Sequence, residues 1–278
     1  MRALKPSDLP PHPDLAPQQT SGSPPELQSF VTEALLESEG FMTTYLPRQF
    51  KVKSSSKQSP PATASVELLT REISATDLPR EVRNSGASSE TWFARTSVHE
   101  NAAKSGTATW QEFDQGLRAN HSQHEMEYTP DVQDAHQVLS WNSELEGMGR
   151  QAAGWEDVSM YLVEMRHHIP PPLNNRVFSV LVITAKKTDR FIVVQIPVDL
   201  AKVPGAKYDR DSKVTAGMYC SIEYGQLIDD GSKVKWQMAT ASDAKGVLPM
   251  WAQKLGVPGA VVKDVGLFID WTQKRRSR

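Results

Sequence analysis

The second half of the chain alternates between apolar and polar positions, which is the period of a β-strand with one buried face. Residues 155–168 show it most clearly and end at the Pro170–Pro172 run, which cannot continue a ladder. Four more segments rich in Val, Ile, Tyr and Trp follow, at residues 176–185, 190–198, 214–224 and 233–241. Asp229, Asp230 and Gly231 predict a hairpin between the last two. Together they predict an antiparallel sheet.

The last of these strands is one-sided. Val234, Trp236 and Met238 share one face, while lysines and a glutamine alternate on the other, which predicts a sheet with one face in water. Upstream, residues 64–73 and 91–98 are further strand candidates, and residues 125–141 fit neither period cleanly. Residues 110–118 predict a short helix, because Thr109 and Glu112 have the spacing of a capping box.

Near the C-terminus the apolar residues recur at every third or fourth position, which is the period of a helix. Residues 246–271 predict a long helix, with Pro258 in its first turn and Val261, Val265 and Phe268 in one apolar stripe. The apolar sector is broad, so we expect this helix to lie across a sheet or a pocket mouth.

The N-terminal segment, residues 1–24, is crowded with Pro, Ser, Gln and Gly and has no apolar period, which predicts a disordered tail ahead of a domain at residues 25–278. Polyproline pieces in it could also bind an SH3-like partner. Residues 26–39 predict an amphipathic helix that ends at Gly40, and residues 53–63 predict a loop.

The composition excludes several classes of function. The 278 residues carry 31 basic and 33 acidic side chains, a net charge of −2, so we expect no nucleic-acid partner. The single cysteine, Cys220, excludes an internal disulfide and a multi-cysteine metal site. The N-terminus has no signal-peptide pattern, and the longest apolar run, residues 177–185, is too short to cross a bilayer. We therefore expect a cytoplasmic monomer with no cofactor and no metal, although transient contact with a membrane surface stays open.

Catalytic motifs are sparse. Gly-x-Ser-x-Gly, Walker and Gly-x-Gly-x-x-Gly patterns are missing from the sequence, and His121 and His124 have no clearly spaced third metal ligand. One acid is notable. Glu164 falls on the strand face of Val158, Met160 and Leu162, so a buried carboxylate would need a partner, for which Arg95 and Arg176 are candidates.

Several segments taken together resemble a START (StAR-related lipid transfer) domain. Residues 241–271 (ASDAKGVLPMWAQKLGVPGAVVKDVGLFIDW) are similar to its closing segment, and residues 170–185 (PPPLNNRVFSVLVITA) to a turn and strand before it. With WFARTSVHE, TWQEF, EYTPDV, GWEDVSMYLVEM and FIVVQIPVDL, the set is similar to a fungal START-like family of unknown function, over about residues 60–271.

The resemblance implies an α+β helix-grip fold, in which a curved antiparallel sheet surrounds a long C-terminal helix and encloses a hydrophobic cavity. It implies binding, and possibly transfer, of a lipid or other hydrophobic small molecule; no catalytic residue carries over. A cyclase or isomerase of fungal secondary metabolism, with Glu164 or a nearby histidine as acid/base, is the alternative. The expected ligand-binding residues are Met160, Leu162, Glu164, Val180, Trp236, Met238, Trp251, Val261, Val265 and Phe268.

Overall fold

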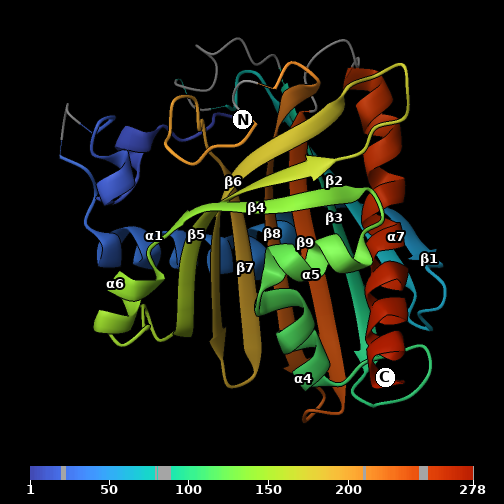
Figure 1. Ribbon diagram of the computed structural model, residues 1–278. Coiled ribbons are helices and arrows are strands. Elements are labelled where there is room, and N and C mark those ends of the chain that lie inside the picture. Colours follow the sequence, from blue (N-terminus) through green and yellow to red (C-terminus); the bar gives the residue numbers. More distant parts are fainter. Residues whose placement is uncertain (20–22, 79, 81–88, 209–210, 244–249, 278) are drawn as a thin grey trace.

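The computed structural model describes residues 1–19, 23–78, 80, 89–208, 211–243 and 250–277, with the backbone alone for residues 250–255 (Figure 1). Its centre is one sheet, whose nine strands within these residues follow the order β1-β2-β3-β9-β8-β7-β6-β5-β4. The strands are β1 (Lys51–Lys57), β2 (Val66–Ser74), β3 (Ser89–Glu100), β4 (Val132–Ser140), β5 (Glu156–His167), β6 (Asn175–Lys187), β7 (Arg190–Pro197), β8 (Val214–Ile228) and β9 (Lys233–Asp243).

The strand pairs along this order are antiparallel, as the alternation predicts, with one addition. The first residues of β8 also pair in parallel with the first residues of β6, where Asn175 lies opposite Val214 and Phe178 opposite Gly217. In Figure 1, β4 runs across β7 to β9, so the sheet curls around one of its faces. The sheet is therefore curved, as a helix-grip fold requires.

The face inside this curl, which we call the α7 face, is covered by helices. The long C-terminal helix α7 (Met250–Arg276) lies along it, beside α4 (Trp110–Phe113) and α5 (His121–Tyr128) (Figure 1). Thr109 and Glu112 form the predicted capping box at the start of α4, which continues as a π-helical turn over Asp114–Arg118. Residues 125–141, which had no clear period, divide between α5 and β4.

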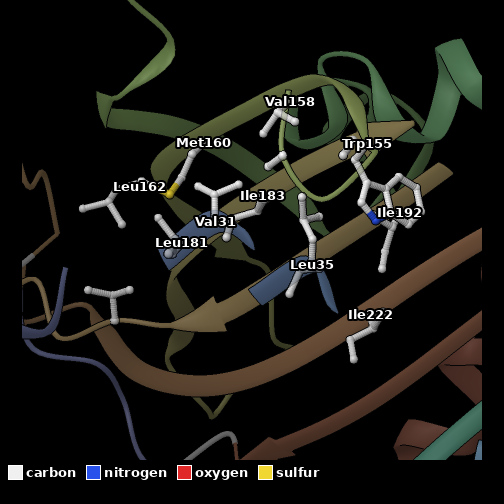
Figure 2. Close-up of a cluster of buried hydrophobic side chains, with 14 of the residues drawn as sticks. Val31, Leu35, Trp155, Val158, Met160, Leu162, Leu181, Ile183, Ile192 and Ile222 are labelled. Atoms are coloured by element: carbon white, nitrogen blue, oxygen red, sulfur yellow. The ribbon is translucent and has the colours of Figure 1, made fainter. Parts of the chain in front are cut away.

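The opposite face, which we call the α1 face, is covered by protein, whereas the sequence predicted that one face of the sheet would be in water. Helix α1 (Leu27–Gly40) packs Val31 and Leu35 against the strands, as Figure 2 shows. The buried strand side chains beneath it include Met160, Leu181 and Ile192. Both faces of the sheet are therefore dry over its central strands. The prediction was wrong because it was made from the polar first half of β9, whereas Ala239, further along the same strand, belongs to the buried cluster beneath α1.

The N-terminal segment is ordered over residues 1–19, which corrects the predicted disordered tail. Leu4 pairs in parallel with Val198 just beyond β7, and Leu9 and Leu15 are fully buried in the cluster beneath α1. Two short 3-10 turns, Pro6–Asp8 and Pro13–Leu15, present these leucines singly. A segment that docks through isolated side chains shows no apolar period, so a periodicity argument cannot find it.

Three local predictions also change. Gly40 has helical angles and does not stop α1, because the chain continues as a π-helical segment, Phe41–Tyr45, and then as α2 (Leu46–Gln49). Pro258 lies inside α7, since this helix begins at Met250. Part of the expected loop at residues 53–63 belongs to the edge strand β1, which pairs with β2 through two register shifts.

Two glycines on β8 allow aromatic rings to lie against its backbone. A Cβ atom at Gly225 would come within 2.2 Å of the Phe191 ring on β7, and one at Gly217 within 2.4 Å of the Phe178 ring on β6. The absent side chains leave room for both rings. They point toward the α7 face, the inner side of the curl.

Candidate functional site beneath the C-terminal helix

The predicted apolar stripe of the helix α7 packs on the α7 face, the inner side of the curled sheet. Val265 and Phe268 are fully buried and Val261 nearly so. The Phe268 ring lies 5.2 Å, between centroids, from both Phe113 of α4 and Trp236 of β9. Phe268 is therefore enclosed by aromatic rings, and this half of α7 is joined to the sheet by ordinary core packing.

The other half of α7 borders an apolar groove. The groove has a volume of about 400 Å³ and lies between the edge strands β1 and β2 and the first turns of the described helix. Gly256 and Gly259 have no neighbouring atom within 4 Å of a Cβ position, so the helix is loosely surrounded there. The groove is lined by Lys53, Ser54, Lys57, Leu68, Pro258, Gly259 and Val262.

Next to this groove lies a buried arginine. Arg95 of β3 is opposite Leu68 in the β2–β3 register, and its side chain is 0% exposed. Its guanidinium carbon lies 3.8 Å from the centroid of the Trp236 ring, a cation–π arrangement. Its Nη2 lies 3.9 Å from Oε1 of Glu223, too far for a hydrogen bond. Within the described residues, none of its three nitrogens has a hydrogen-bond partner.

Carboxyl groups share the interior of the curl with this arginine, and those of Glu223 and Asp264 interact with its charge. Burial raises the pKa of Asp264 on α7 to about 7, although the charge of Arg95 acts in the opposite direction. Burial likewise raises the pKa of Glu125 on α5. Glu223 of β8 accepts a hydrogen bond from Nε1 of Trp236 at 3.1 Å. The interior of the curl thus holds Arg95 together with the acids Glu223, Asp264 and Glu125.

Histidine and tyrosine side chains extend the polar cluster. Burial, with help from Arg95, lowers the pKa of His99 to about 3, so this imidazole is neutral at physiological pH. Burial raises the pKa of Tyr219 well above its ordinary value, and its hydroxyl has no hydrogen-bond partner among the described residues. His121 lies 3.1 Å, through Nε2, from Nε2 of Gln195. The inner face is consequently a mixed surface, apolar near α4 and polar near the middle of β3, β9 and β8.

The ten predicted ligand-binding residues divide between the two faces of the sheet. Val180, Trp236 and Met238 lie on the α7 face of the sheet, and Val261, Val265 and Phe268 lie on α7 itself. Val180 packs in a separate cluster with Met126 of α5. Met160, Leu162 and Glu164 lie on the α1 face and cannot line the same cavity. The side chain of Trp251 lies outside the described residues.

Glu164 is buried, as predicted, and its partners include two backbone groups of the loop after β7. Its carboxylate accepts hydrogen bonds from the backbone N–H groups of Lys207 and Tyr208, at 2.6 and 3.3 Å. Arg95 lies on the opposite face, so the expected pairing with it is wrong. The carboxylate also borders a hollow of about 400 Å³ between the N-terminal segment and the loop after β7. Glu164 therefore anchors this loop to β5.

The sequence predicted a role for Arg95 only as a partner for Glu164. A signal for Arg95 was nevertheless present. In the segment Phe93–His99 the alternating positions Phe93, Arg95, Ser97 and His99 share one face of β3. The period of two places Arg95 on the same face as Phe93, which indicates a charge that points toward the core.

A second, polar hollow of about 280 Å³ opens at the start of β5. Arg118 and Arg150 reach Asp157 from two sides, at 2.8 and 3.5 Å between nitrogen and oxygen. Arg118 also pairs with Asp114, and Arg150 with Glu146 at 3.7 Å. The charges at this hollow are thus paired with one another, which is the arrangement of a structural ion network.

Comparison with known proteins places this arrangement in a family. Residues 92–272, more than half of the chain, match the family model described as "Protein of unknown function (DUF3074)", and the chain belongs to that family. None of the curated proteins matches the sequence. Solved structures do match the fold, and the relatives they show are START domains.

Two human proteins illustrate the likeness. STARD10 is 12% identical, with 86% of this chain and 80% of that chain covered and a TM-score of 0.55. StAR-related lipid transfer protein 5 is 10% identical, with 90% and 100% covered and a TM-score of 0.57. At such identities the likeness concerns the fold. The chain therefore has a START-like α+β fold, as the sequence resemblance implied, and none of its described helices is long and apolar enough to cross a membrane.

Proposed function

We propose that the protein binds a lipid or another hydrophobic small molecule between the sheet and the first half of α7. The observation that carries the proposal is the apolar groove along Leu68, Pro258 and Val262, where the helix leaves space against β1 and β2. Ligand sites are typically concave and mostly apolar, with a few polar groups that fix orientation. The name of one of the similar human proteins, StAR-related lipid transfer protein 5, agrees with this use of the fold.

The test is to fill the groove. Purified protein, stripped of bound lipid, is titrated with a fluorescent fatty-acyl probe, and co-purified lipid is identified by native mass spectrometry. Val262→Trp places an indole in the groove and should reduce probe affinity at least tenfold. Lys263→Trp adds the same ring to the adjacent exposed position and should bind as the parent does. Equal binding by both variants would place the ligand elsewhere.

A cyclase or isomerase is the second candidate, supported by the acids of the inner face. Oε2 of Glu125 has no hydrogen-bond partner among the described residues, and the raised pKa of Asp264 suits a general acid near neutral pH. Glu164, the acid first considered for this role, lies on the other face. Turnover of an added polyketide by the parent, lost in Glu125→Gln, would favour the enzyme over the carrier.

A further inference from the structure

The guanidinium of Arg95, whose nitrogens have no hydrogen-bond partner among the described residues, indicates a ligand group that the apolar groove alone does not. A buried polar group is normally hydrogen-bonded, and each exception requires an explanation. Arginine keeps its charge, because its ordinary pKa is above 12 and burial cannot remove the proton at neutral pH. The cation–π contact with Trp236 partly compensates this charge, but it uses none of the five N–H donors.

We propose that Arg95 binds the carboxylate of an apolar-chain acid whose hydrocarbon part lies in the groove. This inference rests on the proposed function and specifies the ligand for it. A planar guanidinium offers two parallel N–H donors, and a carboxylate is the compact group that accepts both. The geometry points to an acid head because none of the three guanidinium nitrogens has a hydrogen-bond acceptor in the part of the chain that the structure describes.

The position of Arg95 makes it reachable from the groove. Leu68, which forms part of the groove wall, is the cross-strand neighbour of Arg95 on the same face. On the other side Arg95 is paired with Met238, whose side chain keeps accessible surface. Methionine is unbranched and adapts to a neighbouring ligand at small cost, so a head group enters by displacing it. Lys53 and Lys57 at the exposed groove mouth favour the approach of an anion.

The acids around Arg95 bear on this ligand in different ways. Glu223 is a competing carboxylate, held 3.9 Å from Nη2 by its bond to Trp236. Asp264, whose carboxyl interacts with the charge of Arg95, is a hydrogen-bond donor in its protonated form. The site therefore has one fixed competitor for the ligand carboxylate, and substitution of that competitor should strengthen binding.

The experiment compares palmitic acid with hexadecanol, which has the same chain without the charge, by competition against the fluorescent probe. The parent should bind the acid roughly tenfold or more tightly than the alcohol, as expected for hydrogen bonds to a charged group. Arg95→Gln should abolish this preference, and Glu223→Gln should increase it. Arg71→Gln on the neighbouring strand β2, with its side chain on the opposite face, is the matched control and should keep the parent preference.

Outcomes separate the two proposals. If the parent binds both ligands equally, or if Arg95→Gln keeps the preference, the acid head is wrong while the hydrophobic site stands. If the parent binds neither ligand but other lipids in the groove, only the acid head fails. If Val262→Trp has no effect on any ligand, the groove itself is overturned. Glu223→Gln keeps the test decisive if Arg95→Gln does not fold, because weaker binding of the acid by this variant would contradict the proposal.

Discussion

At the scale of single residues, Phe268 shows how α7 is attached to the sheet. Its ring lies within 6.0 Å, between centroids, of four aromatic rings. Phe268→Ala should therefore lower the free energy of unfolding by about 3–5 kcal/mol, the cost of an aromatic cavity in a packed core. Denaturant unfolding measures it. Val262→Ala, at a half-buried groove position, is the comparison and should cost much less; equal losses would show that Phe268 borders open space.

Asp264 gives a stability prediction with a definite sign. Its pKa of about 7 in the folded state exceeds the 3.8 of a free carboxyl, so the folded protein binds the extra proton between these values. Stability from this group is full below pH 3.8 and lost as pH rises through 7, at roughly 1.4 kcal/mol per unit of pKa difference. Asp264→Asn should therefore raise the melting temperature more at pH 8 than at pH 5. A smaller gain at pH 8 than at pH 5 would refute the raised pKa.

His99 has the opposite pH dependence. Its pKa is about 3 in the folded state against an ordinary value near 6.5, so the unfolded chain takes up the proton first. Its contribution is full above pH 6.5 and declines as pH falls toward 3, by roughly 1.4 kcal/mol per pH unit. The unfolding free energy of His99→Gln should therefore approach, or pass, that of the parent on acidification. A constant difference between pH 7 and pH 4.5 would contradict this.

At the scale of elements, the N-terminal segment acts as part of the fold. Leu15 is fully buried, and Nε1 of Trp141 donates to the carbonyl of Pro11 at 3.0 Å. Leu15→Ala should cost about 2–5 kcal/mol of unfolding free energy, while Ala16→Ser at the adjacent exposed position should cost under about 0.5 kcal/mol. Deletion of residues 1–19 should lower the melting temperature further. An unchanged melting temperature would show that the segment only rests on the sheet.

The same elements show what the sequence could predict. Strands with strict alternation, such as β5, and the capping box of α4 were predicted from local patterns, because local side-chain positions determine them. The cover of the α1 face was not, because Leu9 and Leu15 have no period. The inner charge cluster was also missed, since Arg95, Glu223 and Asp264 come together from three elements far apart in the sequence. Neighbourhoods of this kind depend on strand order, which alternation does not encode.

At the scale of the whole molecule, the sheet is the middle of three layers. The N-terminal segment and α1 cover its outer face, and α4, α5 and α7 cover its inner face (Figure 1). The hydrophobic cluster on the outer face is the larger of the two, so it provides the main stability of the domain. The inner layer can then include buried charges and a groove without loss of the fold.

The two glycines of β8 have a consequence for the size of that inner space. Gly225 and Gly217 lie beneath phenylalanine rings that point toward the α7 face. The longest strand of the sheet therefore lacks two side chains on this face. At these two positions the neighbouring rings take the space that side chains of β8 would otherwise fill, so the packing of the strands depends on the missing Cβ atoms. A shorter side chain in the groove would change only the contact with a bound ligand. A methyl group added at Gly225 would instead force the Phe191 ring away from β8. The shape of the inner space is therefore determined in part by the backbone of β8, and not only by the side chains that line it.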